Sequence, residues 1–268
     1  MESPAPTYRE ILYAVDGAAA RITLNRPEKR NPIGPRTIGE LLHAIERAKG
    51  DPAVRALVFT GAGKVFSAGG DLGQFASQAQ GQGPSEGGEL PPGSWVDLNL
   101  ALTRVGKPTI AMVNGHAMAG GLGFVVACDI AIAADDAQLA VPEINVGLWP
   151  MMISANIFRN VPRKQGLLLM MTGDRISAAE GERIGLITRA VPRDQLADVF
   201  QRLVDQLAAK SPRVMQMGLE AFYAMQDLEL EPALRYLQDR LLAVFATEDA
   251  REGLLAFLEK RPPVWTGR

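Results

Sequence analysis

Two glycine-bearing stretches decide the fold: residues 66–72 read FSAGGDL, and residues 113–123 read VNGHAMAGGLG. Each follows an apolar run that predicts a β-strand, over 54–60 in the first case and 108–113 in the second. Glycine lets a ligand approach backbone N–H groups closely, and the free N–H groups of a helix's first turn favour negative charge. Taken singly, each stretch is typical of an ordinary turn. Because two of them follow successive strands, we expect each to supply one N–H group to a single oxyanion.

The surrounding sequence alternates predicted strands and helices. Apolar spacing, with Asp16-Gly17 as a turn signal, predicts the following elements: a hairpin over 11–15 and 20–24, helices over 35–50, 98–105 and 119–127, and a strand over 129–134. Residues 74–93 are rich in Gln, Gly, Ser and Pro, which predicts a mobile loop. The alternation of strands and helices indicates an α/β core.

The chain changes character after about residue 195. Four amphipathic helices are expected there with no strand among them, over 194–210, 213–226, 231–246 and 248–259. The tail from Pro262 to Trp265 is apolar, so we expect it to dock on a folded surface. These patterns divide the chain into an α/β core at 1–195, which would carry the site, and a helical region at 196–268 for packing and oligomerisation.

Composition excludes several classes of protein. The 28 Lys and Arg residues against 30 Asp and Glu give a net charge of −2, which argues against a general nucleic-acid-binding protein. Cys128 is the single cysteine and there are two histidines, so neither a disulfide framework nor a Cys- or His-based metal site is expected. The longest apolar runs are too short to span a membrane, and the first residues lack the features of a signal peptide. A cytoplasmic location is therefore expected.

A third segment, residues 139–150, reads LAVPEINVGLWP. Glu143 is its single carboxylate, among mainly apolar neighbours. Such a group is either a solvated loop charge or a base whose pKa is raised by its apolar surroundings. The sequence alone leaves these two interpretations open.

Together these three segments resemble the crotonase superfamily, also called the enoyl-CoA hydratase/isomerase superfamily. Other motifs of that superfamily follow in the same order: LNRPEKRN at 24–31, NG at 114–115, ACD at 127–129, TGDRISA at 172–178, EG at 252–253 and FLEKR at 257–261. The resemblance implies a spiral of ββα units followed by C-terminal helices that build a homotrimer or a hexamer. It also implies an acyl-CoA thioester as substrate, with no separate cofactor, no nucleic acid and no membrane as partner.

The resemblance also implies roles for particular residues. The thioester oxygen would lie between the N–H groups of Gly70 and Gly120, with Glu143 as the acid/base. The backbone of Ala68 to Leu72, which includes Asp71, matches the adenine pocket. Lys29 and Arg30 match positions near the coenzyme A phosphates, with a solvated turn as the alternative; Trp149 would line the acyl group or belong to the core. Asp71 would cap the backbone locally, and His116 would be structural.

Gly123 is where this sequence departs from typical hydratases, which carry a second glutamate there. The glycine either allows close helix packing, which we favour, or leaves room for a bulky acyl group. Hydration divides conveniently between two carboxylates, whereas moving a double bond needs only one base. One carboxylate can in principle also carry out both parts of hydration by sharing a water, so we expect an enoyl-CoA hydratase first and an enoyl-CoA isomerase close behind. A thioester hydrolase is less favoured because Met151 stands where such members carry Asp, and a non-catalytic acyl-CoA-binding protein is the alternative of another class.

Overall fold

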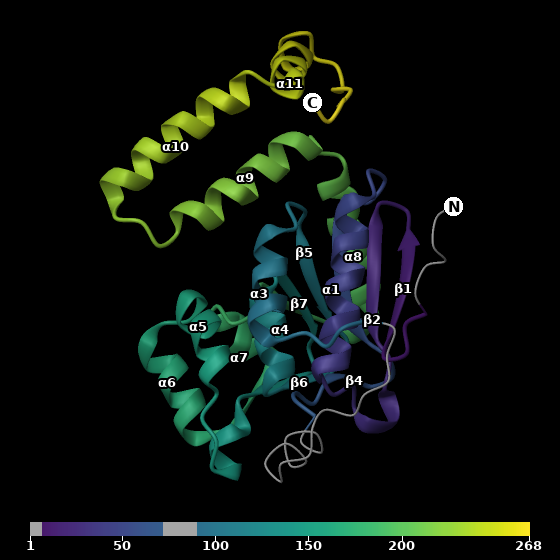
Figure 1. The fold of residues 1–268 in the computed structure, drawn as a ribbon, viewed down its shortest axis with the longest axis vertical. Helices are drawn as coiled ribbons and strands as arrows, with labels where there is room; N and C mark the ends of the chain where they lie inside the picture. Colours follow the sequence, from purple (N-terminus) through teal and green to yellow (C-terminus); the bar gives the residue numbers. More distant parts are fainter. Residues whose placement is uncertain (1–6, 72–89) are drawn as a thin grey trace.

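The computed structural model describes residues 7–71 and 90–268 and arranges them around two β-sheets (Figure 1). The larger sheet has the strand order β1-β2-β3-β5-β7-β10. Its strands are β1 (Ile11–Asp16), β2 (Ala19–Leu24), β3 (Ala56–Gly61), β5 (Thr109–Val113), β7 (Ile130–Ala134) and β10 (Arg189–Val191). β1 and β2 form the predicted antiparallel hairpin, and the remaining pairs are parallel. Leu72 and most of the predicted loop at 74–93 lie outside the described residues.

The smaller sheet is built from the segments that follow the parallel strands. Its order is β4-β6-β8-β9, with β4 (Val65–Ser67), β6 (His116–Met118), β8 (Gln138–Ala140) and β9 (Arg175–Ser177). The chain thus passes from β3 to β4, from β5 to β6 and from β7 to β8, each time from the larger sheet to the smaller one. This repetition places the two glycine turns side by side, because β4 pairs with β6.

Helices cover both faces of the larger sheet. One face packs on α1 (Pro35–Gly50), α3 (Trp95–Arg104) and α4 (Gly120–Ala127). Phe124 of α4 stacks edge-on against Phe59 of β3, with ring centroids 4.9 Å apart. The other face is covered by α8 (Leu196–Ala208), whose Phe200 and Val204 are buried against β3 and β5. The predicted division at 195/196 therefore falls before a helix that completes the core.

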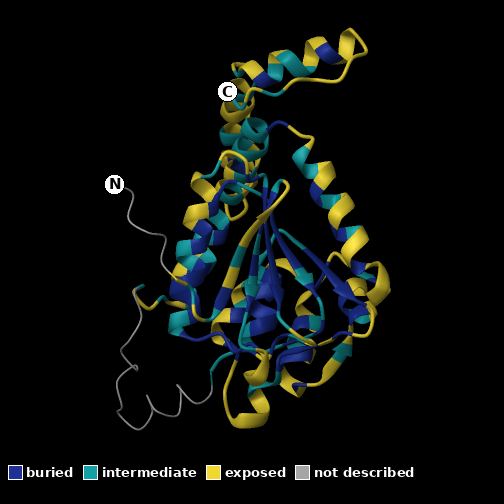
Figure 2. Ribbon diagram, turned by 90° about the vertical axis from the view of Figure 1, so that its right-hand side faces the viewer, coloured by how far each residue is buried: buried dark blue, intermediate teal, exposed yellow. Residues whose placement is uncertain are grey.

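The remaining helices lie at the two ends of the molecule. At one end are η2 (Pro142–Val146), α5 (Met151–Asn160), α6 (Arg163–Thr172) and α7 (Ala178–Arg183); the short helices η1 (Pro27–Lys29) and η3 (Arg193–Gln195) belong to loops. At the other end α9 (Pro212–Met225), α10 (Leu230–Phe245) and α11 (Glu248–Leu258) stand away from the sheets (Figure 1). Figure 2 shows these three helices mostly exposed or half-buried, in contrast to the buried sheet.

The end of the chain docks on the helices of its own chain through Trp265, while Pro262 to Val264 of the predicted tail are exposed. Trp265 Nε1 donates a hydrogen bond of 2.8 Å to the Ala209 carbonyl, and the Trp265 ring lies against Gly253 of α11. The buried Asp249 carboxylate accepts hydrogen bonds from the backbone N–H groups of Thr266 and Gly267. Within the described ranges, none of the helices combines the length and apolar character needed to cross a bilayer.

Candidate active site

The two glycine turns meet at the end of the smaller sheet. Gly69 has φ +101°, and a Cβ there would lie 2.6 Å from the Ala119 Cβ and 3.0 Å from the Gly120 nitrogen. A Cβ on Gly120 would in turn lie 3.4 Å from the Gly70 nitrogen. The Gly70 and Gly120 backbones are therefore neighbours, although 50 positions separate them in the sequence, and a side chain at Gly69 would push the two turns apart.

The first turn leaves one of its N–H groups free. Ala68 N donates to the Arg30 carbonyl at 2.9 Å, and Gly69 N donates to Ser67 Oγ at 3.1 Å. Ile33 N donates to the Gly69 carbonyl at 2.8 Å. The Gly70 N–H group has no acceptor among residues 7–71 and 90–268. Since the peptide that joins Gly69 to Gly70 is planar and trans, its N–H points away from Ile33.

The second turn presents its N–H group through a strained residue. Ala119, immediately before α4, has φ +51° and ψ −131°, a region that alanine enters only at a cost of about 1–3 kcal/mol. Two hydrogen bonds hold it there, because Ala119 N donates to the Ala140 carbonyl and Gly123 N donates to the Ala119 carbonyl. Gly120 is the first residue of α4, so its N–H has no partner inside the helix. The Gly120 N–H therefore lies at the open end of α4, next to the Gly70 N–H, and their use by one oxyanion stays a prediction.

Trp95 closes this site, and sequence reasoning did not single it out. Its indole Cζ2 lies 2.8 Å from where a Cβ on Gly120 would stand, so only glycine fits beneath it. Asn99 Nδ2 donates to the Trp95 carbonyl at 2.7 Å and holds the start of α3. No sequence signal could have located this contact, because it depends on where α3 begins in space.

Glu143 is held near the same place by β8. Ala140, the last residue of β8, bonds to Ala119, and Glu143 follows only three residues later, which limits its Cα to within about 11 Å of Ala140. The side chain is half-buried, and its Oε2 atom is buried without a hydrogen-bond partner in the part of the chain that the structure describes. This burial raises the pKa of Glu143. The carboxyl is thus a partly buried group with a raised pKa rather than a solvated loop charge, and its role as a base stays a prediction.

Gly123 lies beneath Ile153 of α5. A Cβ on Gly123 would stand 2.9 Å from Ile153 Cγ1, which supports the interpretation of close helix packing. The space above Gly123 is filled by Ile153, so it offers no extra room for an acyl group. Its role in substrate binding therefore stays a prediction.

Asp71 and His116 take the following positions. The Asp71 carboxylate pairs with Arg26 at 3.1 Å, which was not predicted. The His116 Nδ1 atom accepts a hydrogen bond from the Gln138 backbone at 3.0 Å, consistent with a structural histidine.

The other predicted binding residues that the structure describes lie at η1 and directly after η2. Lys29 and Arg30 are exposed at η1, and the Arg30 carbonyl binds the turn that carries Gly70. Trp149 follows η2 and is 37% exposed. Leu72 lies outside the described residues. The structure tests neither the phosphate contacts of Lys29 and Arg30 nor the acyl contact of Trp149, which stay predictions.

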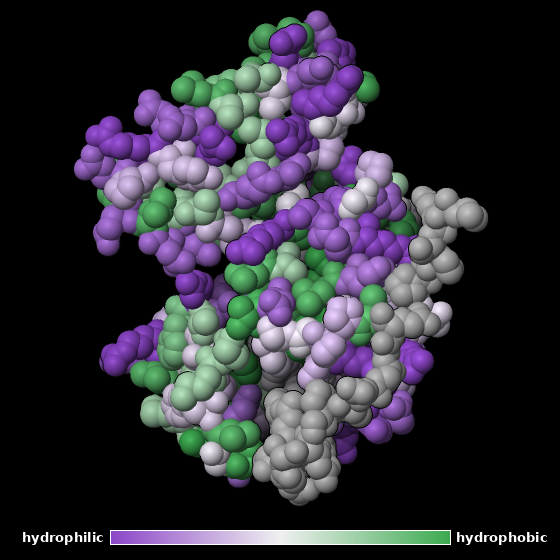
Figure 3. Space-filling model, viewed as in Figure 1, coloured by the Kyte–Doolittle hydropathy of each residue, from purple (hydrophilic) through white to green (hydrophobic). Residues whose placement is uncertain are grey.

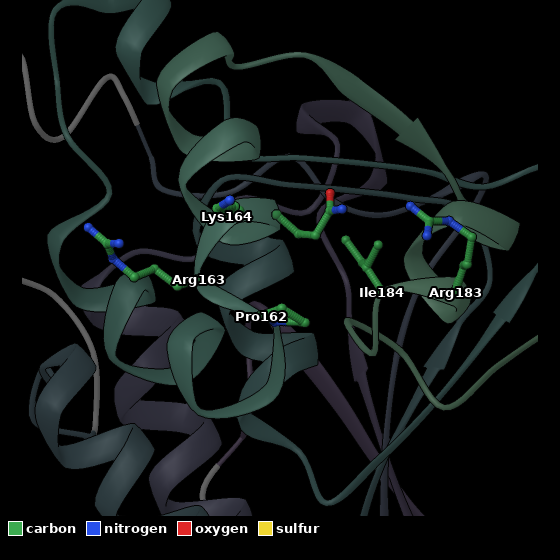
Figure 4. A pocket seen from close by; sticks show the side chains of 6 residues that line it. Pro162, Arg163, Lys164, Arg183 and Ile184 are labelled. Carbon is green, nitrogen blue, oxygen red and sulfur yellow. The ribbon is translucent and has the colours of Figure 1, made fainter.

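A separate hollow of about 510 Å³ lies between the start of α6 and the end of α7. Its lining includes Arg163, Lys164 and Arg183, but the Arg163 side chain points away from Arg183 (Figure 4). Arg183 is also paired with Glu180 at 2.6 Å. These cations do not converge on one point, and the hollow contains none of the predicted site residues.

Solved structures share this architecture. The crystal structure of an enoyl-CoA hydratase from Mycobacterium smegmatis matches with a TM-score of 0.86 and 32% identity, over 96% of this chain and 99% of that chain. Human enoyl Coenzyme A hydratase domain-containing protein 3 matches with a TM-score of 0.85 and 30% identity, over 96% and 100% of the two chains. The predicted fold class, a crotonase-like α/β fold with a C-terminal helical region, is confirmed.

The sequence comparisons narrow this class to a family. The enoyl-CoA hydratase/isomerase family model matches residues 15–268. Carnitinyl-CoA dehydratase of Escherichia coli is 36% identical over 261 residues, which cover 94% of this chain and 97% of that protein. The chain belongs to the enoyl-CoA hydratase/isomerase family, and the prediction of an enzyme of the hydratase type is confirmed at that level.

Proposed function

We propose that this protein binds an acyl-CoA thioester and stabilises its enolate with the N–H groups of Gly70 and Gly120. The observation that carries this proposal is the 3.4 Å approach of a Gly120 Cβ position to the Gly70 nitrogen, with both N–H groups left without an acceptor within the described ranges. When charge moves onto the thioester oxygen, two fixed N–H dipoles stabilise it without having to reorganise.

Glu143 is the proposed acid/base. Its half-buried position and a pKa raised by burial suit a group that takes up and returns a proton. In hydration, the carboxylate takes a proton from water as the water oxygen bonds to C3 of a 2-enoyl thioester, and the protonated Glu143 then gives that proton to C2 of the enolate. The non-catalytic alternative gives no reason to bury an unpaired carboxylate oxygen beside this site.

Isomerisation of a 3-enoyl to a 2-enoyl thioester is the second candidate. Gly123 favours it, because Ile153 fills the space where a second glutamate would need to extend. Glu143 alone would remove a proton from C2 and return it to C4 as the double bond moves. Thioester hydrolysis stays a third and less favoured reaction, since Met151 lies at the start of α5 where an acid is expected for it.

The rest of the thioester would follow the surface around the first turn. The exposed Lys29 and Arg30 would meet the coenzyme A phosphates, and the backbone of Ala68 to Leu72 would meet the adenine. Trp95 and Trp149 would supply apolar walls near the reacting atoms. Coenzyme A enters as part of the substrate, so no separate cofactor is proposed.

A homotrimer or a dimer of trimers is the proposed assembly. The C-terminal helices expose many large apolar side chains, among them Leu234, Leu242, Phe245, Phe257 and Leu258. A second apolar surface covers η2, α5 and α6 (Figure 3), with Val146, Leu148, Met151, Leu168 and Met171 exposed. Contiguous apolar surfaces of this kind are typical of protein interfaces. The cytoplasmic location stays a prediction.

The test is turnover of a panel of 2-enoyl-, 3-enoyl- and 3-hydroxyacyl-CoA esters by wild-type protein and by Glu143→Gln. We expect Glu143→Gln to bind the thioesters while kcat falls by about 10²–10⁴, the usual contribution of a positioned acid/base. Glu46→Gln is the matched control, because Glu46 is an exposed carboxylate on α1. Undiminished turnover by Glu143→Gln would exclude Glu143 as the base. If the wild type turns over none of these thioesters, the proposed catalytic function is wrong.

A further inference from the structure

A buried ion cluster lies directly after Gly70. The Arg26 Nη1 atom is 3.1 Å from Asp71 Oδ2 and 3.2 Å from Glu10 Oε1. The three side chains are only 14%, 17% and 11% exposed, respectively. One guanidinium is thus shared by two carboxylates, in surroundings where water and salt screen their attraction weakly.

We propose that Arg26, acting through Asp71, is a positioning residue for the Gly70 N–H group. This inference rests on the proposed function, because it assigns that N–H to the thioester oxygen. On one side of Gly70, the peptide that carries the N–H is held by the bond from Ile33 to the Gly69 carbonyl. On the other side, the Asp71 carboxylate is held by Arg26. Glycine has no side chain that restricts its own rotation, so both neighbours must be fixed for the N–H to keep one direction.

Arg26 is itself anchored to the core rather than to the surface. Its backbone N–H donates to Asn31 Oδ1 at 2.9 Å, and Asn31 is buried. The Asn31 Nδ2 group donates in turn to the carbonyls of Ala62 and Val65, which precede and begin β4. The second carboxylate, Glu10, accepts a hydrogen bond of 2.5 Å from Thr37 Oγ1 of α1. Asp71 is therefore tied to an arginine that cannot move independently of the sheet.

The same cluster also joins β1, β2 and α1, so its effect on catalysis must be separated from its effect on stability. Asp71→Ala and Glu10→Ala provide a matched pair, because each removes one carboxylate from the same guanidinium. Only Asp71 adjoins Gly70. We expect both variants to lower the melting temperature. Asp71→Ala should also lower kcat by roughly 10- to 100-fold, as misplacement of a catalytic group does, while Glu10→Ala should leave kcat near the wild-type value.

Arg26 variants test the other end of the contact. Arg26→Lys keeps the charge but loses the planar fork of donors, so its kcat should lie between those of the wild type and Arg26→Met. If Asp71 instead helped to bind the adenine of coenzyme A, its substitution would change KM rather than kcat. The split between the two parameters therefore distinguishes positioning of the N–H group from binding of the adenine.

A spectroscopic measurement reports the N–H contact directly. The absorbance of a conjugated dienoyl-CoA shifts to longer wavelength when hydrogen bonds polarise its carbonyl. We expect this shift on binding to wild type and Glu10→Ala, and a smaller shift with Asp71→Ala and Arg26→Met. Equal shifts and equal kcat in all folded variants, or a kcat loss in Glu10→Ala as large as in Asp71→Ala, would overturn the inference. A wild type that turns over no thioester would instead overturn the proposed function.

Discussion

Large apolar side chains are buried in the α/β core but exposed on the C-terminal helices. In the core, apolar residues such as Phe59 and Phe124 pack against one another and are fully buried. In α9 to α11, residues such as Phe257, 82% exposed, have no comparable partner among residues 7–71 and 90–268. The core is complete and holds backbone N–H groups in fixed directions, whereas the helices present an apolar surface that a second chain could cover. Chemistry and assembly are therefore expected to respond to different substitutions.

The largest effect is expected from Gly120→Pro, which removes one N–H donor from the core. A Cβ at Gly120 would also press on Trp95, so the comparison is made in a Trp95→Ala background that relieves this contact. Adding Gly120→Pro to Trp95→Ala should lower kcat at least about a hundredfold further. Proline is tolerated at the first position of a helix, so circular dichroism should show the fold retained. A folded double variant as active as Trp95→Ala would contradict the role of the Gly120 N–H as a donor to the thioester oxygen.

The next largest effect is expected on the oligomeric state, from a substitution in the C-terminal helices. Phe257→Asp places a charge on the exposed face of α11, and we expect sedimentation to show smaller species than the trimer or hexamer proposed for the wild type. Phe257→Leu keeps an apolar side chain and should leave the assembly intact. A wild-type protein that sediments as a monomer at micromolar concentration would refute the proposed interface.

A pair of glycine substitutions measures the packing difference between the two regions. Gly123 and Gly218 both lie in helices, where alanine is preferred by roughly 1 kcal/mol. A Cβ at Gly218 meets nothing within 4 Å, whereas one at Gly123 meets Ile153. Gly218→Ala should therefore raise the free energy of unfolding by up to about 1 kcal/mol, while Gly123→Ala should lower it, since overpacking costs about 1–3 kcal/mol. Equal effects in denaturant titrations would show that Gly123 is not close-packed.

The smallest expected effect is the pH dependence of stability at Glu143. Its pKa in the folded protein is raised by burial above the ordinary value of 4.5, so ionising it disfavours the folded state at neutral pH. Glu143→Gln should be more stable than the wild type at pH 7, and this gain should shrink as the pH falls through the raised pKa and vanish below 4.5. A gain that is constant with pH would show that ionisation of Glu143 is not its source.

Much of the core could be predicted because its elements are long enough to show a period. The hairpin at β1 and β2, the helix beginning at Pro35 and the four C-terminal helices were predicted within a few residues of their observed bounds. The smaller sheet was missed because each of its strands has three residues, too few for alternation to be visible.

Some features of the candidate site could be predicted from the sequence and others could not. The approach of the two glycine turns could be expected because they follow successive strands, whereas the choice of Gly70 and Gly120 came from the resemblance to the crotonase superfamily. The contacts of Trp95 with Gly120 and of Arg26 with Asp71 could not, because each depends on how separate segments settle in three dimensions. Sequence patterns record local periodicity, whereas such contacts follow from the whole fold.

The most direct test of the central claim is a crystal structure of the protein with a bound saturated acyl-CoA. The account predicts a thioester oxygen about 2.7–3.1 Å from the backbone nitrogens of both Gly70 and Gly120, with the Glu143 carboxylate facing C2. A bound thioester whose oxygen contacts neither nitrogen would contradict it.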